Sequence, residues 1–331
     1  MRSWARAIID SKNGGGVKYR ELRIQLKTWR SNLARGLGVL LLVSLGWAGM
    51  LYTHQPNAYA FSMPPTTGSW YVGSYDPTNA YNIGCSHGSY AASVGTGGLV
   101  ILDFGVQINS SESLDFSGAY ITDSQIQSEV VAYAHGYYAC SGNQPIEIAV
   151  GTSNDGGGGS GFGGAWAYEM NGIQSAINSA GYGSKVTIYG GMDFEPNWSG
   201  LSGSVSSQSN AESWSNGFNN VSGRPFYVDY GSANGCPSSG SGSCNNGWTQ
   251  YGEYYVAYGS SPALAAPEIY YYVNAQQWEA INILNPMSFY AATGEYDRNS
   301  STNTNSQAWG DLSSLTGQDV PNSTEFQSGY M

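Results

Sequence analysis

Short apolar and aromatic runs recur along the chain from residue 61 onward, separated by stretches rich in Gly, Ser and Asn. Each run has the length and the β-branched or aromatic content of a buried strand. Several are apolar throughout rather than alternating, which is typical of strands covered on both faces of a sheet. Eight runs fit this description: 69–76, 98–104, 146–151, 186–195, 225–230, 253–259, 267–272 and 287–292.

Helical periodicity lies between some of these runs. Residues 122–138 place their apolar side chains on one stripe, and residues 165–180 show a looser stripe of the same kind. Residues 207–219 and 275–283 are shorter candidates. Helices after the first, fifth and sixth runs are expected to be short or absent.

The alternation of strands and helices indicates a parallel sheet, and eight strands predict an irregular α/β barrel of the (β/α)8 TIM type. Residues 61–331 have the length of one such domain. An all-β sandwich is the alternative, favoured by the Gly, Tyr and Ser content. The Gly-rich stretch at 154–164 contains no Lys, which a phosphate-binding loop requires, and is therefore interpreted as a flexible segment at the rim of a site.

Residues 1–60 have the organisation of an export signal. Nine basic residues lie at or before Arg35, an uncharged apolar run covers 36–52, and Ala58-Tyr59-Ala60 forms a small-residue site. This order predicts a cleaved secretory signal peptide. An uncleaved N-terminal anchor is the alternative. The protein is thus expected to be secreted, or held at the cell surface if the segment remains.

The formal charge of −11 divides unevenly along the chain. Beyond Tyr59 only Lys185, Arg224 and Arg298 are basic, against 21 acidic residues, so this part carries −18. Such a body cannot line a phosphate backbone, which excludes nucleic acid as a partner. Anionic lipid is disfavoured for the same reason, so no membrane partner is expected beyond the N-terminal segment. The charge also predicts a protein suited to acidic surroundings, where protonation relieves self-repulsion.

Four cysteines, an even number in an exported protein, predict two disulfides with three possible pairings. Cys236 and Cys244 bracket a Ser/Gly/Pro loop, which favours a bond between them and leaves Cys85 with Cys140. A zinc site is disfavoured, because no C-x2-C spacing occurs and the histidines beyond residue 60 are few. No metal or cofactor is expected.

Two carboxylates stand at alternate positions where the fourth run ends. Asp193 and Glu195 therefore point to the same face of the strand. Facing the helices would be costly for them, so the barrel lumen at the C-terminal rim, where barrel enzymes keep their sites, is the expected place. Like charges this close raise at least one pKa, which keeps a Glu protonated as a general acid. Solvated rim acids or helix caps are the alternative.

Other acidic and aromatic residues also follow strand ends. Carboxylates bind hydroxyl groups and aromatic faces stack on pyranose rings, so this placement predicts a sugar-binding cleft. The candidates are Asp76, Asp103, Asp229, Tyr75, Trp198, Tyr230 and Tyr258. Core or surface positions are the alternative for each of them. Serine or cysteine nucleophile chemistry is poorly supported, because G-x-S-x-G does not occur.

Around Asp193-Phe194-Glu195 the chain resembles the lysozyme-type barrels of glycoside hydrolase family 25 and, more remotely, the family 18 chitinases, which carry D-x-E at the end of the fourth strand. Tyr75-Asp76 resembles the Asp that those lysozymes have at the first strand. Residues 274–278, with Gln277 and Trp278, are similar to their late Trp/Gln segment. The full chitinase pattern is absent, because Gly191 stands where it has Asp.

Longer stretches, such as 230–237 and 267–278, resemble a group of uncharacterised secreted bacterial proteins. The lysozyme resemblance implies that Glu195 protonates the glycosidic oxygen and that Asp193 holds Glu195 or an N-acetyl group of the substrate. Asp76 or Asp229 would complete the site. One hypothesis is then a secreted glycosidase acting on an amino-sugar polymer such as peptidoglycan. The other is a non-catalytic carbohydrate-binding or cell-surface protein on a degenerate barrel. The partner in both is a polysaccharide or cell-wall glycan.

Overall fold

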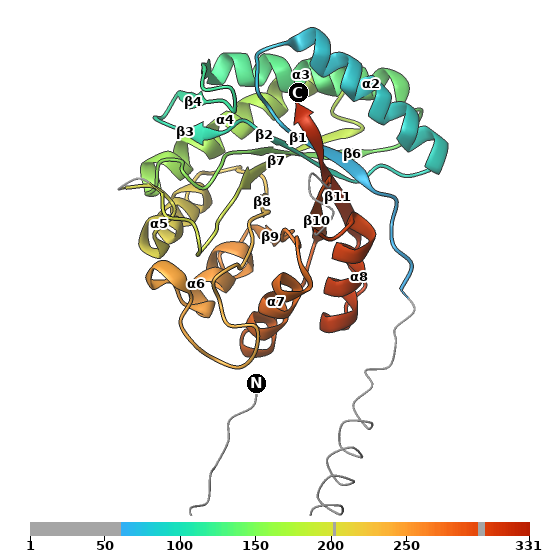
Figure 1. Ribbon diagram of the computed structural model, residues 1–331. Coiled ribbons are helices and arrows are strands. Elements are labelled where there is room, and N and C mark those ends of the chain that lie inside the picture. Colours follow the sequence, from blue (N-terminus) through green and yellow to red (C-terminus); the bar gives the residue numbers. More distant parts are fainter. Residues whose placement is uncertain (1–60, 201–202, 297–301) are drawn as a thin grey trace, which may run out of the picture. The chain divides into compact units, whose positions relative to one another are not determined.

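The computed structural model describes residues 61–200, 203–296 and 302–331, which form a nearly closed parallel barrel (Figure 1). The strand order is β10-β11-β1-β2-β6-β7-β8-β9. Isolated parallel bridges, Ala265 with Phe289 and Glu268 with Thr293, connect the two edges of this sheet. The (β/α)8 prediction is confirmed, and the sandwich is excluded. The strands are β1 (Thr67–Tyr71), β2 (Leu99–Asp103), β6 (Ile146–Gly151), β7 (Val186–Met192), β8 (Tyr227–Asp229), β9 (Ala263–Ala265), β10 (Ala291–Glu295) and β11 (Asn322–Tyr330).

Helices surround the barrel, and the predictions at 122–138, 165–180, 207–219 and 275–283 are confirmed. A small antiparallel sheet, β3 (Val106–Gln107), β4 (Glu112–Leu114) and β5 (Tyr120–Thr122), is inserted between β2 and α3. No helix within the described ranges is long and apolar enough to span a membrane. The helices are α2 (Pro77–Val94), α3 (Asp123–Cys140), α4 (Ser160–Ser179), α5 (Gln208–Asn219), α6 (Gln250–Tyr254), α7 (Tyr272–Leu284) and α8 (Asn305–Thr316).

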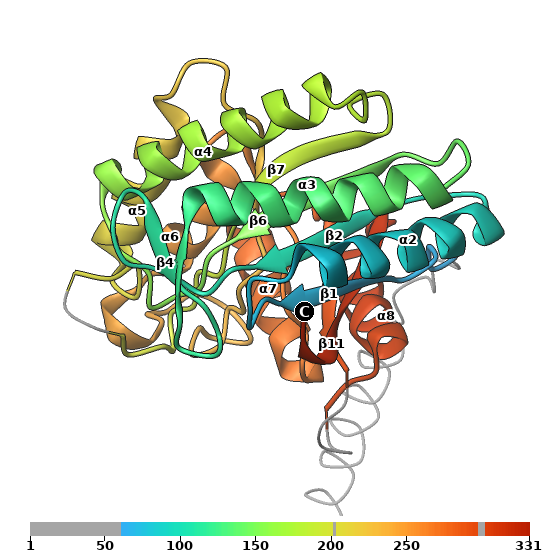
Figure 2. The same ribbon diagram turned by 90° about the horizontal axis from the view of Figure 1, so that it is seen from above.

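The helix after the first strand was expected to be short or absent, and this expectation is wrong. Helix α2 has 18 residues, and its buried positions are all small: Ala80, Gly84, Gly88 and Ala91. A Cβ at Gly84 would lie 2.1 Å from the carbonyl oxygen of Tyr133, so the backbones of α2 and α3 are in close contact (Figure 2). A helix that packs through glycine and alanine shows no stripe of large apolar residues.

Two predicted strands are wrong. Residues 253–259 belong to α6 and to a π-helical turn that continues it, Tyr255–Gly259. Thr249 caps this segment by accepting a hydrogen bond from the Gly252 amide, and Val256 and Ala257 are buried against the barrel. Residues 267–272 are irregular apart from the bridge at Glu268, and α7 begins at their end.

Two strands that no apolar run predicted take these places in the barrel. Strand β9 has only three residues, and β11 is mostly polar, with Phe326 as its buried aromatic residue. Both pair in parallel with their neighbours, β9 with β8 and β11 with β1 and β10. Their positions are therefore set by the sheet around them rather than by a local hydrophobic signal.

The strands separate two apolar cores. Val100 and Leu102 of β2 belong to the large core beneath the helices, whereas Leu99 and Ile101 belong to a small core inside the barrel. Asp103 is the next inward position, and it lies at the carboxyl end of the strand. The lumen is therefore apolar in its middle and becomes acidic at this end.

Both predicted disulfides are confirmed. Cys85 in α2 is bonded to Cys140 at the end of α3, and Cys236 is bonded to Cys244 in the connection between β8 and α6. The predicted export signal and its Ala58-Tyr59-Ala60 site lie outside the described residues.

Candidate functional site

A cavity of about 580 Å³ opens at the carboxyl ends of the strands. Its lining draws on β1, β2, β10 and β11 and on the connections that follow β6, β7, β8 and β9. Among the described residues, six acidic side chains line it, together with several aromatic and amide side chains. The acidic residues are Asp103, Asp155, Asp193, Glu195, Glu268 and Glu295.

The alternation of side chains after β7 brings Asp193 and Glu195 into the cavity. Met192 and Phe194 are buried in the core beneath the helices, where the Phe194 ring lies 5.8 Å from that of Trp214. Asp193 and Glu195 consequently face the opposite way and line the cavity together.

Two donors hold the Glu195 carboxylate. The Ser232 hydroxyl donates to Oε1 at 2.6 Å, and the Asn154 side-chain amide donates to Oε2 at 2.6 Å. Burial raises the pKa of Glu195, and these two hydrogen bonds oppose that rise. Asn154 begins the Gly-rich stretch, so this stretch supplies a residue to the site as well as part of its rim.

Glu268 is the third central carboxylate, and the sequence reasoning missed it. It lies in the segment after β9, is buried, and accepts a hydrogen bond from the Tyr270 hydroxyl at Oε2. In the sequence, Glu268 is marked only by being a single carboxylate within the aromatic run 267–272. Asp103 was identified in the same way, as a single carboxylate in its apolar run.

Carboxylate oxygens of Asp193, Glu195 and Glu268 lie within 4.8 Å of one another. Burial is the main cause that raises the pKa of Asp193 and of Glu268 well above the usual range, and the charge of Glu195 is the next. Groups this close cannot all be ionised near neutral pH, so the cluster keeps at least one proton. A protonated carboxyl beside an ionised one is the arrangement that acid/base catalysis requires. The same three oxygens are the ones through which the cavity would bind a divalent cation.

Aromatic rings form one wall of the cavity. Tyr71 ends β1, and its ring centroid lies 4.7 Å from that of Phe116, in the turn between β4 and β5. The Phe116 ring stacks in turn on Tyr330 of β11, at 6.1 Å. Trp198 comes from the connection after β7, further round the barrel. The acidic side chains of the cavity thus lie among aromatic rings.

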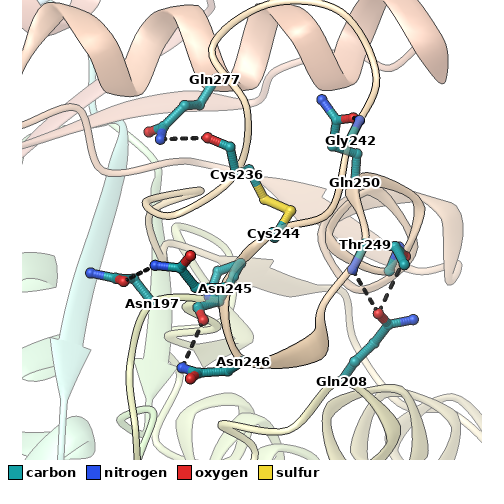
Figure 3. The surroundings of a disulfide bond; sticks show 12 residues. Asn197, Gln208, Cys236, Gly242, Cys244, Asn245, Asn246, Thr249, Gln250 and Gln277 are labelled. Atoms are coloured by element: carbon teal, nitrogen blue, oxygen red, sulfur yellow. Dashed lines mark hydrogen bonds between the residues drawn. A yellow bond between two sulfur atoms is a disulfide. The ribbon is translucent and has the colours of Figure 1, made fainter.

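The Cys236–Cys244 loop, taken together with Asn245 and Asn246 that follow it, braces the segment that carries Trp198. Figure 3 shows Asn245 beside Asn197 of that segment. Asn246 donates hydrogen bonds to the carbonyl oxygens of Pro196 at 2.9 Å and of Trp198 at 2.7 Å. Asn245 donates to the Asn197 side chain. The Trp198 indole also donates to Asp155 at 2.9 Å. The disulfide loop therefore holds this part of the rim in place.

The structure places Asp76 and Tyr75 away from the cavity. Strand β1 ends at Tyr71, so Asp76 lies beyond it and caps α2, accepting from the Thr78 and Asn79 amides at 3.0 Å each. Tyr75 is exposed and donates to Ser128. Tyr71 lines the cavity at the position in the barrel where Asp76 was expected.

Asp229 and Tyr230 are buried at the end of β8, next to the site but not in its lining. Asp229 accepts hydrogen bonds from the Phe194 amide at 3.3 Å and from the Gly231 amide at 3.1 Å. Burial raises the pKa of Asp229 to about 7. Tyr230 donates to the Thr152 carbonyl and packs in the inner core. Asp229 therefore supports the segment on which Glu195 stands.

Three other predicted sugar contacts have structural positions. Tyr258 packs against the core from the π-helical turn. Gln277 donates to the Cys236 carbonyl at 2.8 Å. Trp278 is buried, with its ring 6.0 Å from that of Phe289. None of them lines the cavity, whereas Asp103, Asp193, Glu195 and Trp198 do.

Fold and site together define a (β/α)8 barrel with an acidic, aromatic-walled cavity at the carboxyl ends of its strands. No family model, curated protein or solved structure matches this chain.

Proposed function

We propose that the protein is a secreted glycoside hydrolase that cleaves an amino-sugar polymer such as peptidoglycan. The observation that supports this most is the convergence of Asp193, Glu195 and Glu268 in one aromatic-walled cavity. Glycosidases act through a pair of carboxyl groups beside the scissile bond, one of which must carry a proton. Here burial and mutual repulsion raise the pKa of Asp193 and Glu268, so the cluster retains a proton.

The lysozyme resemblance suggests the role of Glu195, and the hydrogen bonds show how each carboxyl group is oriented. Glu195 is oriented by Ser232 and Asn154 and is the residue proposed to protonate the glycosidic oxygen. Glu268, held by the Tyr270 hydroxyl, is the second carboxylate, in the place that Asp76 or Asp229 was expected to fill. Asp193 lies close to both and shares the proton.

The spacing of these groups favours retention of configuration at the anomeric carbon. Their oxygens approach within 4.8 Å. Inverting enzymes keep their carboxyl groups about 6.5–9.5 Å apart, which leaves room for a water molecule between carboxylate and sugar.

The aromatic residues supply the binding surface. Tyr71, Phe116, Tyr330 and Trp198 present rings to the cavity, and such rings stack on the apolar faces of pyranose units. The two disulfides agree with export to an oxidising compartment, where the polymer would be found.

The test is the substitution Glu195→Gln in a preparation that releases reducing sugars from cell-wall glycan. We expect kcat to fall by about 10²–10⁴-fold, the usual contribution of a general acid. Asp76→Asn is the matched control, because Asp76 caps a helix and lies outside the cavity lining. Unchanged cleavage by Glu195→Gln would overturn the proposal. Binding without cleavage by the unaltered protein would favour the non-catalytic carbohydrate-binding alternative.

A further inference from the structure

We propose that the cavity selects amino-sugar chains whose amines are free and protonated, over chains that are N-acetylated or anionic. This inference rests on the proposed function and narrows the amino-sugar polymer to de-N-acetylated glucosamine chains, in place of peptidoglycan as the example. It is carried by the charge of the lining, by an unpartnered carboxylate oxygen, and by the size and walls of the cavity.

The described part of the lining carries carboxylates and no countercharge. Six acidic side chains face the cavity, and no Lys, Arg or His is among the described residues that line it. Lys185 is engaged elsewhere, with the carbonyl oxygens of Tyr138 and Gly142. Anionic glycans would be repelled from such a cavity, whereas cations would be attracted to it.

One carboxyl group in this lining has an oxygen without a protein partner. Oδ1 of Asp193 is buried and accepts no hydrogen bond from the described residues. Asp103 is fully buried as well, but its carboxyl group accepts from the Gly105 amide at 2.8 Å and lies beside the Tyr230 hydroxyl. A buried carboxylate oxygen without a partner, as in Asp193, is costly unless a donor or a cation reaches it.

An ammonium group meets this need better than an acetamide does. It offers three N–H donors and a full positive charge, so it can serve several carboxylate oxygens at once. An N-acetyl group offers one neutral N–H and adds an acceptor oxygen, which the surrounding carboxylates would repel unless they are protonated. The charged amine is therefore the better complement to this lining.

The size of the cavity distinguishes a sugar from a metal ion. The site could hold a divalent cation through Asp193, Glu195 and Glu268, but such an ion would fill only a small part of about 580 Å³. It would also make no use of Tyr71, Tyr270 or Trp198. A pyranose ring with a charged amine contacts both the carboxylates and the aromatic wall. The sugar ring stacks on the aromatic faces, and these faces also attract cations.

The experiment compares hexamers of glucosamine and of N-acetylglucosamine as substrates, at pH 6.5 and with EDTA present. We expect kcat/KM to be at least about tenfold higher for the glucosamine hexamer, a factor that corresponds to about 1.4 kcal/mol. Glu295→Gln removes one lining charge without touching the central three carboxylates, and it is expected to reduce that ratio. Equal or faster cleavage of the acetylated hexamer overturns this inference while the proposed hydrolase function stands.

Binding to Glu195→Gln supplies a second measurement that does not depend on cleavage. Calorimetry in buffers of different ionisation enthalpy should show protons released on binding the glucosamine hexamer, because a cation lowers the pKa of the carboxyl groups around it. In this variant the titratable groups that line the cavity are Asp103, Asp155, Asp193, Glu268, Glu295, Tyr71, Tyr270 and Tyr330. Binding with proton release but no cleavage by the unaltered protein would support the selectivity and contradict the hydrolase. Tighter binding of the acetylated hexamer, or activity lost with EDTA and restored by Ca²⁺ or Mn²⁺, would overturn the inference.

Discussion

At the scale of single residues, the state of Glu195 results from opposing effects. Burial raises its pKa, while the hydrogen bonds from Ser232 and Asn154 stabilise the ionised form and lower it. The same two bonds fix the orientation of the carboxyl group. The orientation of Glu195 as a proton donor thus depends on hydrogen-bond donors from the connections that follow β6 and β8.

Asn154→Ala should therefore change the pH dependence of activity. Loss of a bond to the carboxylate raises the pKa of Glu195 further, so the alkaline limb of kcat/KM is expected to move to higher pH. Poorer orientation should also lower kcat by about 10- to 100-fold. Asn282→Ala is the control, because Asn282 bonds to Glu279 in α7, away from the cavity. A limb that stays in place or moves to lower pH would contradict this account of Glu195.

At the scale of elements, helices α2 and α3 are joined through their backbones. Glycines stand at the contact on both sides, and a Cβ at Gly136 would lie 2.0 Å from the Tyr81 carbonyl oxygen. The Cys85–Cys140 disulfide ties the same pair. Close packing replaces the large apolar side chains that hold other helices to the barrel.

Gly136→Ala is expected to lower the free energy of unfolding by about 1–3 kcal/mol or more, because the methyl group meets backbone that can yield only if the helices separate. Urea unfolding monitored by circular dichroism measures the change. Gly310→Ala in α8 is the matched control. A Cβ there meets no atom within 4 Å, so this variant should be about 0.5–1 kcal/mol more stable. Equal effects of the two variants would argue against the close α2–α3 contact.

The two disulfides should differ in what their loss affects. Cys236→Ser with Cys244→Ser releases the loop that braces Trp198, so KM should rise several-fold, with a stability loss of about 2.5 kcal/mol for a separation of 8 residues. Cys85→Ser with Cys140→Ser should cost about 4 kcal/mol for its separation of 55 residues and leave KM unchanged. Steady-state kinetics and urea unfolding of both double variants separate the two roles. The opposite pattern of KM values would show that the Cys236–Cys244 loop does not brace the rim.

At the scale of the whole molecule, the protein carries many buried carboxyl groups. Burial raises the pKa of Asp103, Glu129 and Asp229 to about 7 and that of Glu169 to about 8. The folded state therefore keeps protons that the unfolded chain releases near pH 4. Stability from these groups is fully present at low pH and is lost as the pH rises through about 7–8.

We accordingly expect the urea midpoint to fall steadily between pH 4 and pH 8. Glu129→Gln should flatten this slope, because Glu129 is fully buried and burial is the main cause that raises its pKa. Between pH 4 and pH 8, the free energy of unfolding of this variant should fall by on the order of 2 kcal/mol less than that of the unaltered protein. A stability maximum at neutral or alkaline pH would contradict this view of the charge balance.

Local signals predicted part of the candidate site. Alternation at a strand end was enough to place Asp193 and Glu195 on one face, and Asp103 followed from its apolar run. The same kind of signal failed for Asp76, because β1 ends earlier than its aromatic run does. Glu268 was hidden within a run that looked like a strand. Where a strand ends depends on its neighbours, which no single run reveals.

The amino-acid sequence by itself determined the barrel class, four helices, both disulfide pairings and the acidic character of the body. These properties depend on periodicity, on loop length and on composition, which are local or additive. Only the tertiary structure decided that α2 is a full helix, that 253–259 is helical, and that Glu268 rather than Asp76 joins Asp193 and Glu195. Close backbone packing, the register of short strands and the meeting of side chains from separate connections arise only when the sheet closes.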